Sequence, residues 1–576
     1  MLGEAVDVLL KYKKLCERSY GPNALKNIFV TATGQVELTN DGAAILRCLN
    51  LQHPVAHLIK ESLIGFHAKY GDGTKTLLFL VAETIAQIDR TITRSKEVQQ
   101  IEKLKFVRAL QKLQYSLIDD HVLKNIKLEK YSMTSMKPND ETATLLKNLI
   151  STKLQGSLDS HSCSHLSTLL IDLLLRNCSD EGDIKPCLQA LYDSSQTIFV
   201  DQVGGLPWQS CFVDGVILPR QFHDFACPQQ TLKDVRFTLM SLDFDTDECD
   251  QDAVITIRDA SFLDDILHWK SRVYRLLVDH WRNLNINLVI SNCRVPDQLA
   301  LLLAKRKIYV VNFCPEFDIE RLSFLSGCTL TSELQDVLSN FTIGSAQSCE
   351  LIPVSGRSYV KLSGVKNCVD TPESSAKYIS GHILVNGPSP GACQQIRTVL
   401  TDTCKLLVTC VGDNIDKPKS DIDCDDTEHS NQTIDVIEGG GAFELAMYHL
   451  LSSPLPSYQE DGTMLTVLKI LAQSYITVPL LLLQNSHRPS APKSSITDVF
   501  KMSPKPNEFP FTPRGIDARS GAGLMKHRNI IEPLNLKIGQ WHHLIMIVSQ
   551  LLRLDGIQSV RGSLQKISLN DDEDED

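Results

Sequence analysis

The segment Gly71-Asp72-Gly73-Thr74-Lys75-Thr76 combines residue types that can bind a phosphorylated ligand. It stands directly before the apolar run 77–82, so it is expected to open a helix, where backbone N–H groups are free and the helix dipole is positive. The two glycines allow the backbone to approach an anion without a Cβ in the way. Asp72 would repel a bare phosphate, so its natural partner is a metal ion that rides on the phosphate. The functional interpretation of this segment is a cradle for a Mg-nucleotide.

The residues of this segment alone leave two interpretations open. One is the nucleotide cradle, and the other is an ordinary helix start with conventional capping and no ligand. A Walker A loop is excluded, because that motif needs Gly immediately before the Lys, and Thr74 stands before Lys75 here.

The elements that must position the segment are mainly helical and come from both ends of the chain. Apolar spacing predicts a helix over 2–20 that ends at Gly21-Pro22, and Thr33-Gly34 between two short apolar runs predicts a β-hairpin. Further helices are predicted from Asp41-Gly42, with Asp41 near the N-cap, and from Pro54. Later in the chain, helices are predicted over 391–408, from Gly439-Gly440-Gly441-Ala442, over 463–483 and over 541–553.

The pattern changes near residue 206. Short β-like runs occur at 212–213, 216–218, 235–240 and 254–257, and helix spacing returns over 262–281. The segments 288–290, 298–304 and 308–311 form a βαβ-like unit. Residues 206–374 therefore predict a separate α/β domain inserted into a helical protein. Residues 413–432 are acidic and polar, and residues 571–576 form an acidic tail. Six prolines between 489 and 513 exclude a continuous helix in that segment.

Composition narrows the function classes. Among 576 residues, 43% are apolar and 22% charged, which is typical of a soluble globular protein. The net charge of −11 disfavours non-specific nucleic-acid binding, and no apolar run approaches the ~20 residues of a membrane span. The 17 scattered cysteines indicate reduced thiols in a cytosolic protein. His161-Ser162-Cys163-Ser164-His165 lacks a second cluster, so it is interpreted as a helix-start surface loop and not as a metal site.

Taken in order, these pieces resemble a subunit of the group II chaperonins, the eukaryotic cytosolic (TCP-1 type) family. The resemblance covers nearly the whole chain and rests on ten segments: Gly21-Pro22, 39–46, 71–74, 147–153, 287–290, 320–322, 439–442, 472–485, 532–537 and 551–555. Each is weak alone, and their order and spacing carry the resemblance.

The resemblance implies a multidomain chaperonin fold, with a mainly α-helical equatorial domain, a small α/β intermediate domain and an inserted α/β apical domain. The expected equatorial parts are 1–125 and 436–567, the intermediate parts are 126–205 and 375–410, and the apical domain is 206–374. Residues 411–435 are expected to form an acidic flexible insert, and 568–576 a disordered acidic tail.

The resemblance also implies ATP or ADP with Mg²⁺ as the bound cofactor. Asp72 would hold Mg²⁺, while Asp41 and Asp402 would position the attacking water as the catalytic carboxylates. Placing Asp402 on another domain would make hydrolysis depend on domain closure. The residues implied to bind the nucleotide are Gly21, Pro22, Gly42, Gly71, Asp72, Gly73, Thr74, Thr76, Gly440, Gly441 and Glu532, the last against the ribose.

Three departures from the family pattern surround the same site. Ala24 stands in place of a Gly, Lys75 in place of a hydroxyl residue, and Asn529 in place of a Gly. Lys75 would either pair with phosphate or compete with the cation. The prolines of 489–513 and the insert at 413–432 would alter surfaces where ring neighbours meet, which puts an intact symmetric ring in doubt.

With the segments 49–56 and 70–75, these departures resemble the divergent Bardet–Biedl syndrome chaperonin-like proteins, of the syndrome 10 type. That resemblance implies assembly of the ciliary coat complex, the BBSome. The expected partners are related chaperonin-like subunits, the cytosolic chaperonin, and unfolded or partly assembled coat subunits, with no nucleic acid and no membrane span. The expected location is cytoplasmic, with the centrosome or the cilium base as a further option.

Two hypotheses follow. The first is an ATP-dependent chaperone, and the second is a pseudo-chaperonin scaffold that binds partners without useful hydrolysis. Apolar residues at helix spacing form either a client surface or a face that packs into its own domain: Phe262, Leu263, Ile266, Leu267, Val273, Leu276 and Leu277.

Overall fold

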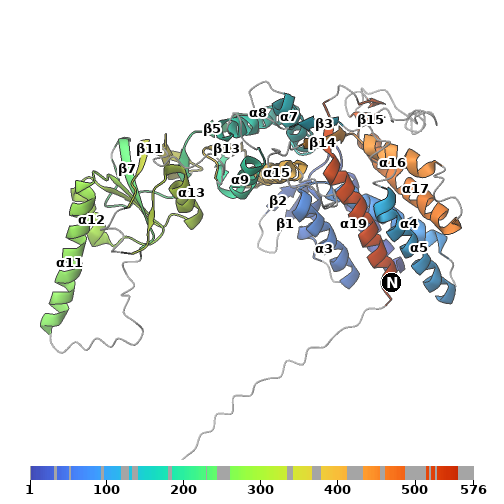
Figure 1. The fold of residues 1–576 in the computed structure, drawn as a ribbon, viewed down its shortest axis with the longest axis horizontal. Coiled ribbons are helices and arrows are strands. Elements are labelled where there is room, and N and C mark those ends of the chain that lie inside the picture. The colour runs from blue at the N-terminus through green and yellow to red at the C-terminus, as the bar shows by residue number, and fades with distance from the viewer. Residues whose placement is uncertain are drawn as a thin grey trace, which may run out of the picture.

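The computed structural model describes most of the chain as an elongated molecule with a helical end, a middle region and a distal α/β region (Figure 1). The described residues are 2–30, 36–50, 53–92, 96–117, 129–132, 141–178, 184–228, 230–242, 260–333, 341–365, 378–411, 433–453, 461–486, 514–517, 521–525 and 529–555. The predicted strand at 254–257, the polar segment 413–432, the proline-rich segment and the acidic tail lie outside them.

The helical end is built from the first and last parts of the chain around one buried helix, α4 (Thr74–Thr91). Twelve residues of α4 are buried, and it packs against α1, α3, α17 and α19. A helix that is apolar on most of its surface needs neighbours on all sides, which explains its central position. The other helices here are α1 (Leu2–Glu17), α2 (Gly42–Cys48), α3 (Pro54–Tyr70), α5 (Lys96–Leu117), α16 (Ala442–Ser452), α17 (Gly462–Asn485) and α19 (Leu534–Arg553).

Three small antiparallel sheets border the helical end. One is the hairpin of β1 (Asn27–Val30) and β2 (Val36–Thr39). The second joins distant parts of the chain: β14 (Thr433–Glu438) lies between β3 (Glu129–Ser132) and β17 (Ile531–Pro533). The third pairs β15 (Arg514–Asp517) with β16 (Gly521–Leu524).

The middle region has helices packed beside a three-stranded sheet, and it too comes from two parts of the chain. Strand β13 (His382–Gly387) runs parallel to β4 (Phe199–Val203) and antiparallel to β5 (Cys211–Val213). The helices are α7 (Glu141–Leu154), α8 (Ser160–Asn177), α9 (Ile184–Asp193), α10 (Ser195–Ile198) and α15 (Pro390–Cys410), with a 3₁₀ turn at Pro207–Gln209. The long helix α15 contacts α3 and α19 of the helical end, so it connects the two regions.

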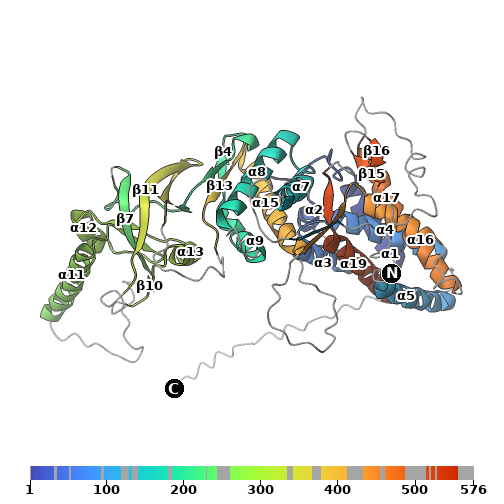
Figure 2. The ribbon, with the colours of Figure 1, turned by 45° about the horizontal axis from the view of Figure 1, so that its top comes forward.

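The distal region is a mixed sheet with helices at its faces and edge (Figure 2). Its strand order is β6-β12-β11-β7-β8-β9, and β10 pairs with β7. Strands β7, β8 and β9 are parallel, whereas β6, β11 and β12 pair antiparallel. The bounds are β6 (Val216–Leu218), β7 (Leu232–Met240), α11 (Ala260–Asn283), β8 (Leu288–Ser291), α12 (Asp297–Lys305), β9 (Tyr309–Val311), α13 (Glu316–Ser326), β10 (Leu330–Thr331), β11 (Gly344–Val354) and β12 (Arg357–Ser363).

The distal and middle regions meet at a buried polar cluster around Arg321 on α13. Its guanidinium donates to the carbonyls of Ile379 (2.9 Å) and Gly381 (3.0 Å) and lies 3.2 Å from His382 Nε2. His382 Nε2 also accepts from the Ile217 N–H at 2.9 Å, so this nitrogen carries no proton. Burial, together with the neighbouring arginine, holds the pKa of His382 well below its usual range.

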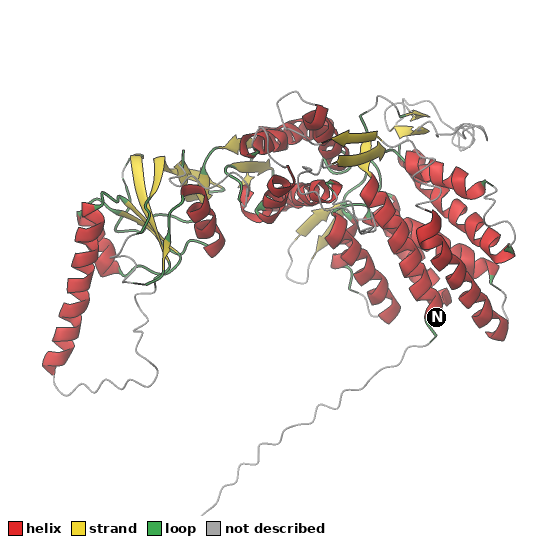
Figure 3. Cartoon of the chain, viewed as in Figure 1, coloured by secondary structure: helices red, strands yellow, loops and turns green. Residues whose placement is uncertain are grey.

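Several element predictions are confirmed. The hairpin, Asp41 as the N-cap of α2 and the βαβ unit of β8, α12 and β9 are all present. The predicted start of the last helix at 541 is wrong, because α19 begins at Leu534. The early turns contain Asn535 and Lys537, which break the apolar pattern, and the Lys537 ammonium is buried in an ion pair. Secondary structure along the chain is shown in Figure 3.

Helices α11 and α17 concern two predictions about partners, the apolar client surface and the absence of a membrane span. On α11, Leu276 is exposed while Leu277 and Trp281 are buried, and the predicted apolar positions 262–267 lie outside the described side chains. Helix α17 is long and apolar enough to cross a membrane by composition, yet 61% of its apolar window is buried within the molecule. A core helix passes the same test, so α17 is only weak support for a membrane span.

Candidate functional site

A cavity of about 720 Å³ lies where α7 and α15 of the middle region face the helical end. Its wall combines segments from residue 20 to residue 540, so only the folded chain can form it. Ten of the residues predicted to act in the site line it: Gly21, Pro22, Asp41, Asp72, Gly73, Thr76, Asp402, Gly440, Gly441 and Glu532.

Two helices begin at the cavity with glycine N-caps. Gly73 caps α4 and Gly441 caps α16, both at φ +78°, and neither cap provides a side-chain hydrogen bond to the helix. The N-cap residues therefore supply no side-chain oxygen to the first N–H groups, although the Ala442 N–H donates to the Gly439 carbonyl at 3.4 Å. Both helix dipoles add positive potential. This arrangement fits an anionic ligand such as a phosphate chain.

Asp72 is held by a lysine from the middle region. Lys153, on α7, places its Nζ 2.8 Å from Asp72 Oδ1 and donates to the Gly71 carbonyl at 3.0 Å. Partial burial would raise the pKa of the Asp72 carboxyl, but the Lys153 ammonium outweighs it and holds that pKa below its usual value. The carboxylate is 40% exposed and stays ionised, as a metal ligand must.

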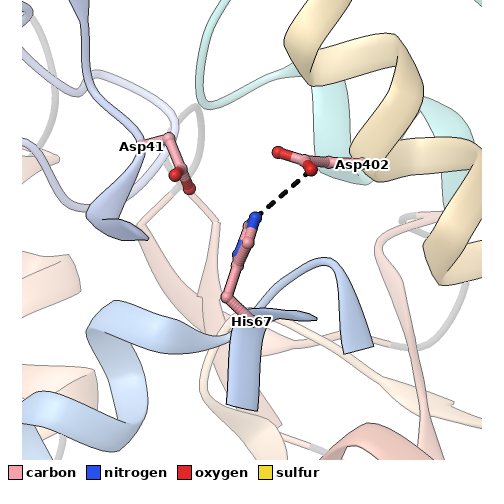
Figure 4. A group of neighbouring side chains, drawn as sticks. All are labelled: Asp41, His67 and Asp402. Atoms are coloured by element: carbon pink, nitrogen blue, oxygen red, sulfur yellow. Dashed lines mark hydrogen bonds and ion pairs between the residues drawn. The ribbon is translucent and has the colours of Figure 1, made fainter. Parts of the chain in front are cut away.

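Asp41, His67 and Asp402 converge from three elements (Figure 4). Asp41 Oδ2 accepts the Ala44 N–H at 2.8 Å as the α2 N-cap, and one potential ligand atom from each of the three residues lies within 4.8 Å of the others. Burial alone would raise the pKa of Asp41, but His67 and Lys153 lower it below its usual value. His67, at the end of α3, lies 3.2 Å from Asp402 Oδ1 through Nε2.

Lys75 does not extend toward open space in the cavity. Its ammonium donates to the backbone carbonyls of Ser19 and Asn40, the latter at 2.9 Å. Burial lowers the pKa of Lys75, and the carboxylate of Asp41 partly offsets this effect. In this structure Lys75 therefore connects two loops of the wall, one of which contains the Gly21-Pro22 turn.

The opposite wall carries a buried charged triad. Lys537 Nζ lies 2.7 Å from Glu444 Oε1 and 2.6 Å from Glu532 Oε2. Burial raises the pKa of Glu532, and the nearby Glu444 raises it further, while Lys537 opposes both effects. Glu532 thus reaches the cavity as part of a network that fixes its position.

Three predicted residues lie outside the cavity wall. Gly42 begins α2, Gly71 is the left-handed C-cap of α3, and the buried Thr74 bonds His67 Nδ1 through its hydroxyl at 3.2 Å. These residues lie next to wall residues in the chain and fix the helix ends that carry them. The two departures other than Lys75 are also accommodated: Ala24 donates its N–H to the Gly21 carbonyl, and Asn529 adopts φ +56°, which asparagine tolerates better than most residues.

Sequence reasoning missed two side chains of the site, His67 and the ammonium of Lys153. His67 lies one helical turn before Gly71, so a turn-based search of the preceding helix could have found it. Lys153 had a weaker signal, since its partner is 81 residues away.

The model of the TCP-1/cpn60 chaperonin family matches residues 13–415. The chain belongs to this family. A thermosome alpha subunit of Archaeoglobus fulgidus is 22% identical over 543 residues, covering 94% of this chain and 89% of the relative. A thermosome subunit of Pyrococcus abyssi is 23% identical over 540 residues, with coverages of 93% and 87%. A thermosome alpha subunit of Thermoplasma acidophilum is 21% identical over 538 residues, also with 93% and 87%.

Membership in the chaperonin family agrees with the architecture, and the predicted multidomain chaperonin fold is confirmed. The helical end, middle region and distal region follow the order expected for equatorial, intermediate and apical domains of a chaperonin. Strand β5 (Cys211–Val213), within the predicted apical segment, pairs with β13 of the middle region.

Proposed function

We propose that this chain is an ATP-dependent chaperone of the group II chaperonin type. Membership in the chaperonin family supports the chaperone function. The observation that carries the nucleotide part is the convergence of Asp41, Asp72 and Asp402 on a cavity where two glycine-capped helices begin.

The residues present fit a Mg-nucleotide. The N-termini of α4 and α16 would bind phosphate oxygens, and Asp72 would hold the metal after Lys153 releases it. Mg²⁺, when bound, supplies charge neutralisation to the phosphates. Asp41 and Asp402 would orient or deprotonate a water molecule. Since Asp402 belongs to α15, this geometry depends on how the middle region packs against the helical end.

The first experiment measures Mg-dependent ATP binding and hydrolysis on purified full-length protein, with its mass determined in parallel. Asp402→Ala is expected to bind nucleotide and to lose most turnover, whereas Asp72→Ala is expected to weaken Mg-ATP binding itself. Turnover that is unchanged in Asp402→Ala would reject the hydrolytic role.

A second candidate is a scaffold that keeps the chaperonin fold without useful hydrolysis. The observation that favours it is the Lys153 ammonium on Asp72, together with Lys75 where the family has a hydroxyl residue. On this proposal, Asp72→Ala and Asp402→Ala proteins still support partner assembly. If both variants fold and neither supports assembly, the scaffold proposal fails.

For partners, we propose the role implied by the resemblance to the Bardet–Biedl syndrome chaperonin-like proteins of the syndrome 10 type. The chain would help to assemble the BBSome in the cytoplasm, with the centrosome or cilium base as a further location. Related chaperonin-like subunits and the cytosolic chaperonin would join it, as the same resemblance implies. The relatives named as thermosome subunits support assembly with related subunits. Depleting the protein should reduce the assembled coat complex on size-exclusion chromatography, and re-expression should restore it. A coat complex of normal amount after depletion would exclude this role.

A further inference from the structure

The cluster of Asp41, His67 and Asp402 has the composition of a metal site in its own right. Two carboxylates and one imidazole converge from α2, α3 and α15, with one ligand atom from each residue within 4.8 Å of the others. Donor atoms around one metal ion lie about 3 Å apart when the bonds are near 2.1 Å. Small rotations of the two carboxylates would therefore bring the three ligand atoms to the spacing that one metal ion needs.

His67 is oriented as a ligand by its surroundings. Its side chain is only 5% exposed, and Nδ1 lies 3.2 Å from the hydroxyl of Thr74, which leaves Nε2 directed at the carboxylate of Asp402. In this structure the Nε2–H donates to the Asp402 carboxylate, so a metal ion at Nε2 would replace that proton. Nδ1–H would then donate to the Thr74 hydroxyl, as metal-binding histidines commonly donate their other ring N–H to an oxygen, which fixes the tautomer and the ring plane. Asp41 is oriented as well, through the Ala44 N–H.

The two nearby lysines are engaged elsewhere. Lys153 Nζ pairs with Asp72 at 2.8 Å, and Lys75 donates to the carbonyls of Ser19 and Asn40. Lys153 still acts on this cluster from a distance, because Asp402 and Asp41 both raise its pKa and it lowers the pKa of Asp41. The ammonium therefore balances part of the negative charge, and a divalent ion would balance the rest as a direct partner of both carboxylates.

We propose that Asp41, His67 and Asp402 bind a first-row divalent transition metal, of which Mn²⁺ is the test ion, in the absence of nucleotide. Mg²⁺ prefers oxygen ligands and retains its waters, whereas an imidazole nitrogen suits first-row transition metals such as Fe, Ni and Zn. Mn²⁺ suits the two carboxylates of this mixed donor set. The bound ion ties α3 of the helical end to α15 of the middle region. The site shares two carboxylates with the proposed hydrolysis site but does not require ATP, so it is tested without it.

The experiment titrates chelator-treated, full-length protein with Mn²⁺ by calorimetry and by electron paramagnetic resonance. Mn²⁺ is chosen because it competes poorly for the chain's thiols. We expect one tight Mn²⁺ per chain, with nitrogen coupling in pulsed spectra and at least tenfold weaker binding of Mg²⁺. Binding of Mn²⁺ no tighter than of Mg²⁺, or without nitrogen coupling, would overturn the proposal.

Variants assign the ligands. His67→Ala should remove the nitrogen coupling, Asp402→Asn should weaken Mn²⁺ binding, and Thr74→Val should weaken it by about tenfold to a hundredfold, since only the orienting contact is lost. His57→Ala, an exposed histidine on the same helix, is the matched control and should bind like the original protein. Circular dichroism confirms folding of each variant, and wild-type affinity in a folded His67→Ala protein contradicts the site.

ATP binding in Mg²⁺ is measured separately on His67→Ala. Retained nucleotide binding with lost Mn²⁺ binding supports the metal site independently of the nucleotide proposal. Tight Mn²⁺ binding by a protein that binds no ATP would leave the metal site standing and remove the proposed nucleotide function.

Discussion

Lys153 and Asp72 form an ion pair of 2.8 Å between the middle region and the helical end. The ammonium thus occupies one oxygen of the carboxylate that we propose as the Mg²⁺ ligand. A bound metal must compete with a cation that belongs to the protein itself. Because α7 carries that cation, metal binding at Asp72 and the contact between the two regions are coupled.

Lys153→Met should lower the Mg²⁺ concentration needed for half-maximal ATP binding by about threefold. The reason is that a partly exposed ion pair contributes less than about 1 kcal/mol, and this competing contact is lost. Fluorescent-nucleotide binding measured across a Mg²⁺ series tests the expectation. Lys147→Met, on the same helix and away from the cavity wall, is the control. An unchanged or higher Mg²⁺ requirement in Lys153→Met would show that the lysine assists the nucleotide instead.

Gly73→Ala should weaken nucleotide binding and destabilise the protein by about 1–2 kcal/mol. Gly73 has φ +78°, where a side chain is strained, and its Cβ would lie 2.4 Å from Gln540 Nε2. Gly65→Ala is the opposite case, because Gly65 lies inside α3 with no atom within 4 Å of its Cβ position. It should stabilise the protein by up to about 1 kcal/mol. Chemical unfolding compares the two, and equal effects would refute the assigned strain.

The ion pair of Asp72 predicts a pH dependence of stability. The folded-state pKa of Asp72 lies below its usual value, so the unfolded state binds more protons in the acidic range and stability rises with pH there. The contribution is complete above the unfolded pKa of about 4 and is lost as pH falls through the folded value. The difference in unfolding free energy between the original protein and Asp72→Asn should therefore shrink below about pH 4. A constant difference from pH 6 to pH 3 would contradict the pairing.

Lys537→Met should destabilise the protein by about 3–5 kcal/mol. Removal of this buried cation leaves Glu444 and Glu532 facing each other without a counter-charge. Urea unfolding at neutral pH measures the loss, with the exposed Lys469→Met of α17 as the control. A loss as small as that of Lys469→Met would mean that the two carboxyls are not both charged in the folded protein.

The sequence allowed prediction of what is local and periodic. Asp41 could be predicted as an N-cap because its partner, Ala44, is three residues away. The βαβ unit was predictable because apolar runs and a helix alternate within 24 residues, from Leu288 to Val311. The chaperonin fold followed from several weak segments in a fixed order, which no single segment could have shown.

Contacts between distant residues could not be predicted in this way. His67 meets Asp402 across 335 positions, and Lys153 meets Asp72 across 81. The position of His67 one helical turn before Gly71 was a local signal, but the local pattern of α3 or α7 does not reveal which distant carboxylate either side chain contacts. The start of α19 was predicted wrongly for a related reason. Lys537 has the pattern of a solvent-exposed residue, and only the folded structure shows that Glu444 pairs with it.

Arg321→Lys should loosen the junction between the distal and middle regions. The guanidinium is fully buried and reaches two carbonyls and His382 at once, a geometry that a lysine ammonium cannot reproduce. Loss of a buried hydrogen bond costs about 1–3 kcal/mol, so the unfolding free energy should fall by at least that amount. The amides of Ser380 and Gly381, now bonded to Asn177 Oδ1 and the Gly215 carbonyl, should exchange hydrogen faster. The exposed Arg236→Lys is the control, and unchanged exchange at 380–381 in folded Arg321→Lys would show that Arg321 does not hold the junction.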